Sequence, residues 1–206
     1  MKTFDLSIYF VADPACCGAR DVVDVVMAAV KGGVTMVQYR NKSDNMQEIH
    51  IHTSILSELL KVQNIPFLVN DHVDVARAVG AAGVHLGQGD VSPEEAREKL
   101  GDLAIIGQTA FTPEHMAAVD PSIVDYVGCG PFYETKTDKG KPVLGPEKFK
   151  EIIVLSPVPV VGIGGITPDN AQAVIDAGAN GVAMMRSISA ADNVEEAARR
   201  FREVLS

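Results

Sequence analysis

Short apolar runs recur eight times along this chain, and each is followed by a turn and an amphipathic stretch. None alternates apolar with polar residues, so each is typical of a strand covered on both faces, as strands of a parallel sheet are. The predicted strands are Leu6–Ala12, Met36–Tyr39, Phe67–Val69, Val84–Leu86, Ala104–Ile106, Val124–Val127, Val158–Val161 and Val182–Met184. This repetition restricts the chain to the α/β class.

Eight strand–helix units in 206 residues leave about 26 residues per unit, which is compact but sufficient for a (β/α)₈ TIM barrel. No linker, low-complexity segment or charge block divides the sequence, so residues 1–206 are expected to form a single TIM-barrel domain. A doubly wound open sheet has the same alternation of strands and helices, and the pattern alone leaves it open as the rival fold.

The helices are marked by apolar spacing and by their first residues. Val22, Val26, Ala29 and Val30 follow helical spacing near the start of the chain, and residues 194–205 do so at its end. Three hydroxyl–proline pairs predict helix starts in which the hydroxyl residue is the N-cap. These pairs are Ser92-Pro93, Thr112-Pro113 and Thr167-Pro168.

Charge and composition exclude several classes of protein. The formal net charge of −9 argues against nucleic acid and anionic membranes as partners. No run approaches the ~20 apolar residues of a membrane span, and Asp5 and Ser7 interrupt any signal-peptide core. The three cysteines do not have the spacing of a metal site or a redox motif, so we expect reduced thiols at Cys16, Cys17 and Cys129. We therefore expect a cytoplasmic protein that acts on small molecules.

In both folds ligands bind at the carboxyl ends of the strands, where the second predicted strand carries three ligand-type side chains. Gln38, Arg40 and Lys42 are two residues apart, so in a strand they share one face. Two cations and an amide placed in this way suit a phosphate or diphosphate. A solvated strand end is the simpler alternative.

The third and fourth predicted strands are each followed by an acid. Asp71 comes directly after Asn70, and Asp90 follows a glycine-containing turn. Carboxylates at neighbouring strand ends can face each other, and a bound Mg²⁺ would relieve their repulsion. Mg²⁺ prefers one or two carboxylates with water and substrate phosphate, which suits a diphosphate held by Arg40 and Lys42. The alternative is that Asp71 only caps the next helix.

The later strand ends add further polar groups. Thr109 follows the fifth strand, and the longest polar loop, 128–141, follows the sixth, as expected of a lid or binding loop. Glycines within 162–165 leave backbone N–H groups open for a phosphate, as in many such barrels. His85 lies within a strand and is expected to be a satisfied core residue. Two anion sites predict an enzyme that joins two phosphorylated molecules and expels diphosphate.

Six segments in this order resemble the thiamine-phosphate synthase family. They are QYRNK at 38–42, NDHVDVA at 70–76, GVHLGQGD at 83–90, GQT at 107–109, GPFYETKT at 130–137 and GIGGIT at 162–167. The resemblance covers nearly the whole chain and implies a (β/α)₈ barrel with Mg²⁺ as cofactor. It implies a transferase that condenses hydroxymethylpyrimidine diphosphate with the thiazole phosphate, or its carboxylated form, to thiamine phosphate, with release of diphosphate.

The resemblance also implies a role for each matching position. The pyrimidine diphosphate site would comprise Gln38, Tyr39, Arg40, Asn41, Lys42, Asn70, Thr109 and Lys139. The thiazole phosphate site would comprise Thr135, Lys136, Thr137, Gly165, Met185 and Arg186. Asp71 and Asp90 would hold Mg²⁺, and catalysis would rest on Arg40, Lys42 and Thr109.

The chain departs from the family pattern at three positions. Asp138 stands where the family often has lysine, and Lys139 or Lys141 is expected to substitute for it. Gly89 replaces a common acid, and Phe111 stands where many relatives carry histidine. The related thiazole tautomerases use such a histidine and lack the metal aspartates, so the sequence favours the synthase over them. A non-catalytic phosphate-binding barrel is a further alternative, and association into a homo-oligomer stays open.

Overall fold

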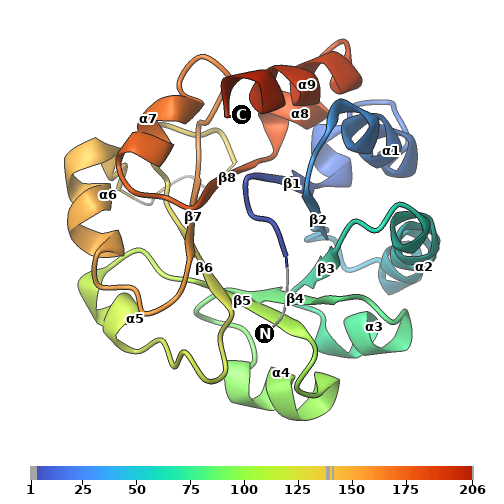
Figure 1. Cartoon of the computed structure of the whole chain (residues 1–206). Helices are drawn as coiled ribbons and strands as arrows, with labels where there is room; N and C mark the ends of the chain where they lie inside the picture. Colours follow the sequence, from blue (N-terminus) through green and yellow to red (C-terminus); the bar gives the residue numbers. More distant parts are fainter. Residues whose placement is uncertain (1–3, 138–139, 141, 206) are drawn as a thin grey trace.

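Eight parallel strands close into a barrel in this computed structural model, which describes residues 4–137, 140 and 142–205 (Figure 1). Neighbours in the barrel follow chain order, and β8 pairs with β1. The strands are β1 Ile8–Ala12, β2 Met36–Tyr39, β3 Phe67–Asn70, β4 Gly83–Leu86, β5 Ile105–Thr109, β6 Tyr126–Cys129, β7 Val160–Ile163 and β8 Gly181–Met184. The closed order confirms the TIM barrel and excludes the open sheet.

Helices surround the barrel in the view of Figure 1. They are α1 Val22–Gly32, α2 Met46–Val62, α3 Val73–Ala78, α4 Pro93–Leu100, α5 Pro113–Ala117, α6 Gly145–Ile153, α7 Ala171–Asp176, α8 Arg186–Ser189 and α9 Val194–Val204, with a short 3₁₀ helix, η1, at Pro14–Cys16. Because helices cover the outer face of the strands, the apolar runs do not alternate. Across the described ranges, no helix has the length and apolar character needed to cross a membrane.

Side chains of each strand alternate between the barrel interior and the layer under the helices. On β2, Met36 belongs to the interior cluster and Val37 to the outer one. Gln38 is the next inward position, and on β3 the inward Leu68 is followed by Asn70. Polar side chains therefore replace the apolar core towards the carboxyl ends of the strands.

The segment before β1 lies across the amino ends of the strands, in the middle of the ring in Figure 1. There Phe4 packs against Tyr126, with ring centroids 6.0 Å apart. Outside the barrel the first helix of the chain packs against the last, α1 against α9. A Cβ at Gly32 would lie 2.5 Å from the Cβ of Ala198, so this contact requires glycine.

Two expectations about element boundaries are corrected. β5, β6 and β7 end two or three residues later than predicted, because Gly107, Gly128 and Gly162 continue the strands beyond the apolar runs. Ser92 and Thr112 cap α4 and α5 as predicted.

The predicted N-cap at Thr167 is wrong. Its backbone N–H donates to Asn170 Oδ1 at 2.8 Å, which closes a turn over residues 168–170, and α7 begins only at Ala171.

Candidate active site at the carboxyl ends of the strands

Charged side chains from neighbouring loops pair at the carboxyl ends of the first four strands. Arg40, directly after β2, donates to Asp13, directly after β1. Lys42 donates to Asp71, directly after β3. The carboxyl group of Asp71 lies close enough to that of Asp90, in the loop after β4, for each to shift the pKa of the other. The pair Asp13–Arg40 and the group Lys42–Asp71–Asp90 are here together called the charged rim.

The backbone holds Asp71 in an unusual conformation at this rim. Its φ is 62°, a left-handed value that is uncommon outside glycine, and its N–H donates to His85 O at 3.0 Å. The N-cap of α3 is His72, which makes no side-chain capping bond, so Asp71 does not have the capping role considered as its alternative. Asp90 is oriented by Gly87, whose N–H donates to Asp90 Oδ2 at 2.7 Å.

The two rim carboxyl groups perturb each other. Burial raises the pKa of Asp71, the contact with Lys42 opposes this shift, and the adjacent Asp90 adds to it. Burial would also raise the pKa of Asp90, but its hydrogen bonds with Asp71 and with the Gly87 N–H lower that pKa overall. Two carboxylates in contact repel unless they share a proton or a cation, and a divalent cation would relieve the repulsion.

Amide and hydroxyl groups line the barrel interior at the same end. Gln38 is buried, and its Nε2 donates to Tyr9 Oη at 2.6 Å. Asn70 is also buried, and its Nδ2 donates to His85 O at 3.1 Å. Thr109, the last residue of β5, lies 3.0 Å from His85 Nε2 through its Oγ1. Three predicted pyrimidine-site residues thus lie on the inward face of the strands.

His85 has a partner on each ring nitrogen, which agrees with its expected role as a satisfied core residue. Its Nδ1 lies 2.9 Å from Tyr126 Oη, and Tyr126 Oη lies 2.7 Å from Tyr9 Oη. Burial lowers the pKa of His85 to about 4 and raises the pKa values of both tyrosines above their usual range. All three rings are therefore neutral near pH 7.

Two predicted pyrimidine-site residues point elsewhere. Tyr39 lies on the outer face of β2, with its Oη 2.9 Å from Nδ1 of His52 on α2. Asn41 Nδ2 donates to Tyr39 Oη and to Glu48, and its Oδ1 accepts from the Ser43 N–H. These side chains hold the loop between β2 and α2 and do not join the charged rim.

The loop after β6 lies against the glycine turn after β7. The Phe132 N–H donates to Ile163 O at 2.8 Å, and the Tyr133 N–H donates to Gly164 O at 3.0 Å. Gly165 has a φ of 67°, and a Cβ there would lie 2.4 Å from Glu134 O. Glycine at this position therefore allows the two loops to touch.

This arrangement places the predicted thiazole phosphate residues of the two loops together. Thr135 and Thr137 are half-buried, and Thr135 Oγ1 accepts from the Thr137 N–H at 3.3 Å. Lys136 between them is exposed. Lys139 and its neighbours Asp138 and Lys141 lie outside the described residues.

The end of β8 meets the loop after β1. Met185 Sδ lies 3.6 Å from Cys16 Sγ, and Arg186 Nη1 lies 3.7 Å from the same sulfur. Cys16 is in η1, which Asp13 caps through its side chain. Asp13 was missed by the sequence analysis, although an acid directly after the first strand matches the pattern that identified Asp71.

The position of the tautomerase histidine holds an apolar ring. Phe111 is half-buried after β5, and its ring centroid lies 4.7 Å from that of His115. No histidine therefore occupies that position, in agreement with the preference for the synthase.

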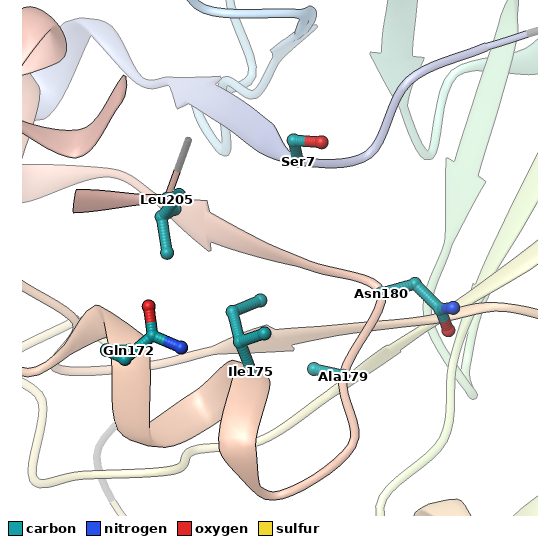
Figure 2. A pocket seen from close by; sticks show the side chains of 6 residues that line it. All are labelled: Ser7, Gln172, Ile175, Ala179, Asn180 and Leu205. Carbon is teal, nitrogen blue, oxygen red and sulfur yellow. The ribbon is translucent and has the colours of Figure 1, made fainter. Parts of the chain in front are cut away.

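Pockets at the opposite end of the barrel offer no comparable chemistry. One of about 270 Å³ is lined by residues that precede β1 and β8 and by residues of α7 and the C-terminal segment (Figure 2). Its lining carries no charged side chain; the six residues are Ser7, Gln172, Ile175, Ala179, Asn180 and Leu205. A broader groove at the same end includes Phe4, Thr35 and Arg202. The charged rim is thus the better candidate for catalysis.

Comparisons with known proteins identify the family of this chain. A family model described as thiamine monophosphate synthase matches residues 8–188. The chain is 43% identical over 204 residues to a thiamine-phosphate synthase from Azorhizobium caulinodans, covering 98% of this chain and 96% of that protein. It is 38% identical over 206 residues to one from Natronomonas pharaonis, with the same coverage. A solved thiamine phosphate pyrophosphorylase from Pyrococcus furiosus is similar with a TM-score of 0.86 at 32% identity, covering 97% of this chain and 95% of that one. The chain therefore belongs to the thiamine monophosphate synthase family.

Proposed function

We propose that this chain condenses hydroxymethylpyrimidine diphosphate with the thiazole phosphate, or its carboxylated form, at the charged rim. Family membership gives it thiamine-phosphate synthase activity, a transferase reaction of thiamine biosynthesis. The contact between Asp71 and Asp90 beside Arg40 and Lys42 is the observation that carries the proposal. Two carboxylates and two cations on one rim suit a diphosphate bound with a divalent cation.

The donor set fits Mg²⁺, with Asp71 and Asp90 as its protein ligands. A positive charge between the two carboxylates would relieve their mutual repulsion. Throughout the described part of the chain, no group of three or more His, Cys, Asp and Glu side chains is placed to hold a metal ion. The remaining ligands would be water and substrate phosphate, as is usual for Mg²⁺. When bound, the ion would neutralise charge on the diphosphate.

Arg40 and Lys42 would bind the diphosphate directly. Each pairs with a carboxylate, so each cation lies at the rim. The Lys42 side chain is 52% exposed and can turn from Asp71 towards a ligand, whereas Arg40 is held by the buried Asp13. Lys139 is proposed as a further cation for the same group.

Gln38 and Asn70 would hold the pyrimidine end of the substrate, and Thr109 would contact the same substrate at its diphosphate. Their polar groups lie on the inward face of the strands, next to the rim. Tyr39 and Asn41 are assigned an indirect role, because their side chains support the loop that carries Arg40 and Lys42.

The thiazole phosphate would bind between the loops after β6, β7 and β8. Thr135 and Thr137 offer hydroxyl groups, Lys136 offers a cation, and Gly165 leaves its backbone open. Met185 and Arg186 would approach from the start of α8. Contact between the β6 and β7 loops supports a single phosphate site there.

In the reaction, a bond forms between the thiazole nitrogen and the pyrimidine methylene carbon. The bond from that carbon to the diphosphate oxygen breaks, and its electron pair leaves with the diphosphate. No general base is required, because the thiazole nitrogen carries no proton. Arg40, Lys42 and Thr109 stabilise charge on the leaving group, and the phosphate site holds the nucleophile in line.

Incubation of the purified chain with both substrates and Mg²⁺ tests this function. Mass spectrometry should detect thiamine phosphate, and its absence would contradict the proposal. Arg40→Ala should lower kcat by about 10²-fold, as the loss of one charge-stabilising donor does in other enzymes. Near-normal turnover in this variant would exclude the proposed role of Arg40.

The remaining proposals concern the protein as a whole. Cys16, Cys17 and Cys129 are free thiols in the structure, which supports a reducing compartment, and we assign the enzyme to the cytoplasm. We further propose that residues 1–206 act as one domain with small-molecule substrates as its main partners. Association into a homo-oligomer would be measured by light scattering.

A further inference from the structure

A chain of hydrogen bonds crosses the barrel interior and ends at Thr109, the last residue of β5. It runs from Gln38 Nε2 to Tyr9 Oη at 2.6 Å, to Tyr126 Oη at 2.7 Å, to His85 Nδ1 at 2.9 Å, and from His85 Nε2 to Thr109 Oγ1 at 3.0 Å. Its five members come from five different strands, β2, β1, β6, β4 and β5. Only the two end members belong to the predicted binding site.

Two glycines make this chain possible. A Cβ at Gly107 would lie 2.2 Å from Cζ of Tyr126, so the tyrosine ring crosses β5 only because no side chain is there. A Cβ at Gly128 would lie 3.1 Å from Cε1 of His85. Both rings occupy space that the glycines leave. The packing of the barrel interior therefore holds the rings of Tyr126 and His85 in contact.

The proton count along the chain fixes its direction. Gln38 Nε2 can only donate, so Tyr9 Oη accepts from it. Within the described residues, Tyr126 Oη is the acceptor that remains for the single proton of Tyr9, so Tyr9 donates to Tyr126. Tyr126 then gives its own proton to His85 Nδ1. A neutral imidazole that accepts at Nδ1 carries its proton on Nε2, so His85 donates to Thr109 Oγ1.

This direction decides what Thr109 presents to a ligand. Its oxygen accepts from His85, and within the described residues its hydroxyl proton has no other acceptor. The Thr109 hydroxyl group can therefore donate this proton to a bound ligand. If the hydrogen bonds ran in the opposite direction, Thr109 would donate its proton to His85. It would then offer only lone pairs to an anionic diphosphate.

We propose that the chain from Gln38 to His85 holds the Thr109 hydroxyl as a hydrogen-bond donor to the diphosphate, and that Tyr126 is the positioning residue that sets this direction. The inference rests on the proposed function for the identity of the ligand. The direction itself is a property of the ligand-free protein. Tyr126 acts through His85 and does not contact the substrate.

The tautomer of His85 gives the direct test. In ¹⁵N-labelled, ligand-free protein at neutral pH, two-dimensional NMR of the imidazole nitrogens should show the proton of His85 on Nε2. A His85→Gln variant identifies its signals. A proton on Nδ1 would overturn the inference whether or not the enzyme makes thiamine phosphate.

Tyr126→Phe removes the hydroxyl group of Tyr126, and with it one proton of the hydrogen-bond chain, but changes the side-chain volume little. The His85 tautomer should become mixed, and kcat should fall about tenfold while the KM for the thiazole phosphate stays within twofold. Tyr39→Phe is the spectral control. It removes the phenol hydroxyl group that contacts His52 and should leave the His85 signals unchanged.

An unchanged kcat in Tyr126→Phe, or an equal rise in the KM of both substrates, would overturn the positioning role. If this variant does not fold, the tautomer in the parent protein still decides the direction. A correct tautomer in a protein without synthase activity would refute the proposed function alone.

Discussion

Asp13→Asn tests how Arg40 is held at the charged rim. Asp13 is only 4% exposed, and its two oxygens have separate tasks. Oδ1 accepts from the Ala15 N–H at 2.9 Å and caps η1, whereas Oδ2 accepts from Arg40. Asparagine keeps the shape and the capping oxygen but removes the negative charge. The substitution therefore separates the ion pair from the cap.

The expected loss follows from the burial of this pair. A hydrogen bond to a charged group contributes about 1.5–3 kcal/mol when it is well shielded. The Arg40 side chain is 26% exposed, so we take the lower end, about 1.5 kcal/mol. If this free energy orients Arg40 for the diphosphate, kcat/KM for the pyrimidine substrate should fall roughly tenfold. The KM for the thiazole phosphate should change less than about twofold.

Steady-state kinetics with each substrate varied in turn would measure these effects, and urea denaturation would report stability. Asp21→Asn is the matched control, because Asp21 caps α1 through a 2.7 Å bond from the Val23 N–H and makes no ion pair within the described ranges. The control should retain the parent kinetics. A folded Asp13→Asn enzyme with parent-like kcat/KM for the pyrimidine substrate would refute the reasoning.

Three further predictions address the metal, the packing and the buried thiol. Asp71→Asn should raise the Mg²⁺ concentration for half-maximal activity at least tenfold in a metal titration, since it removes a charged ligand; an unchanged titration would remove Asp71 from the metal site. Gly107→Ala should cost about 3 kcal/mol in urea denaturation, because its Cβ would lie 2.2 Å from the Tyr126 ring, while Gly89→Ala, with open space around it, should be neutral. Burial raises the pKa of Cys129 to about 12, so the folded state keeps a proton that the unfolded state loses above about pH 9. From pH 9 to 11 the parent should therefore lose on the order of 2 kcal/mol more stability than Cys129→Ala, and equal losses would contradict this.

The fold could be predicted because its strongest signals are local. The unalternating runs at Met36–Tyr39 and Phe67–Val69 reflect strands covered on both sides, and Ser92 and Thr112 cap helices through bonds to residues three positions away. Thr167 misled the prediction because the same hydroxyl–proline pair also suits a turn. Asn170, three residues further on, closes that turn with its own side chain.

Part of the site could also be predicted, because strand ends in a barrel share one mouth. This rule identified Arg40, Lys42 and Asp71, which make direct contacts at the charged rim. Tyr39 was assigned by the family resemblance and not by this rule, and its side chain lies on the outer face of β2, as strand alternation requires. A motif match assigns a role to every residue of a segment. In a strand, however, only every second side chain faces the barrel interior.

The misplaced strand ends and the missed hydrogen-bond chain have one physical cause. Gly107 and Gly128 lie just beyond the apolar runs that predicted β5 and β6. In the barrel they remain in β5 and β6, since the rings of Tyr126 and His85 occupy the space that their missing side chains leave. These contacts join residues 19 to 43 positions apart, so no local pattern contains them. Gly107 and Gly128 therefore leave the space on the inward face of the barrel into which the rings of Tyr126 and His85 pack.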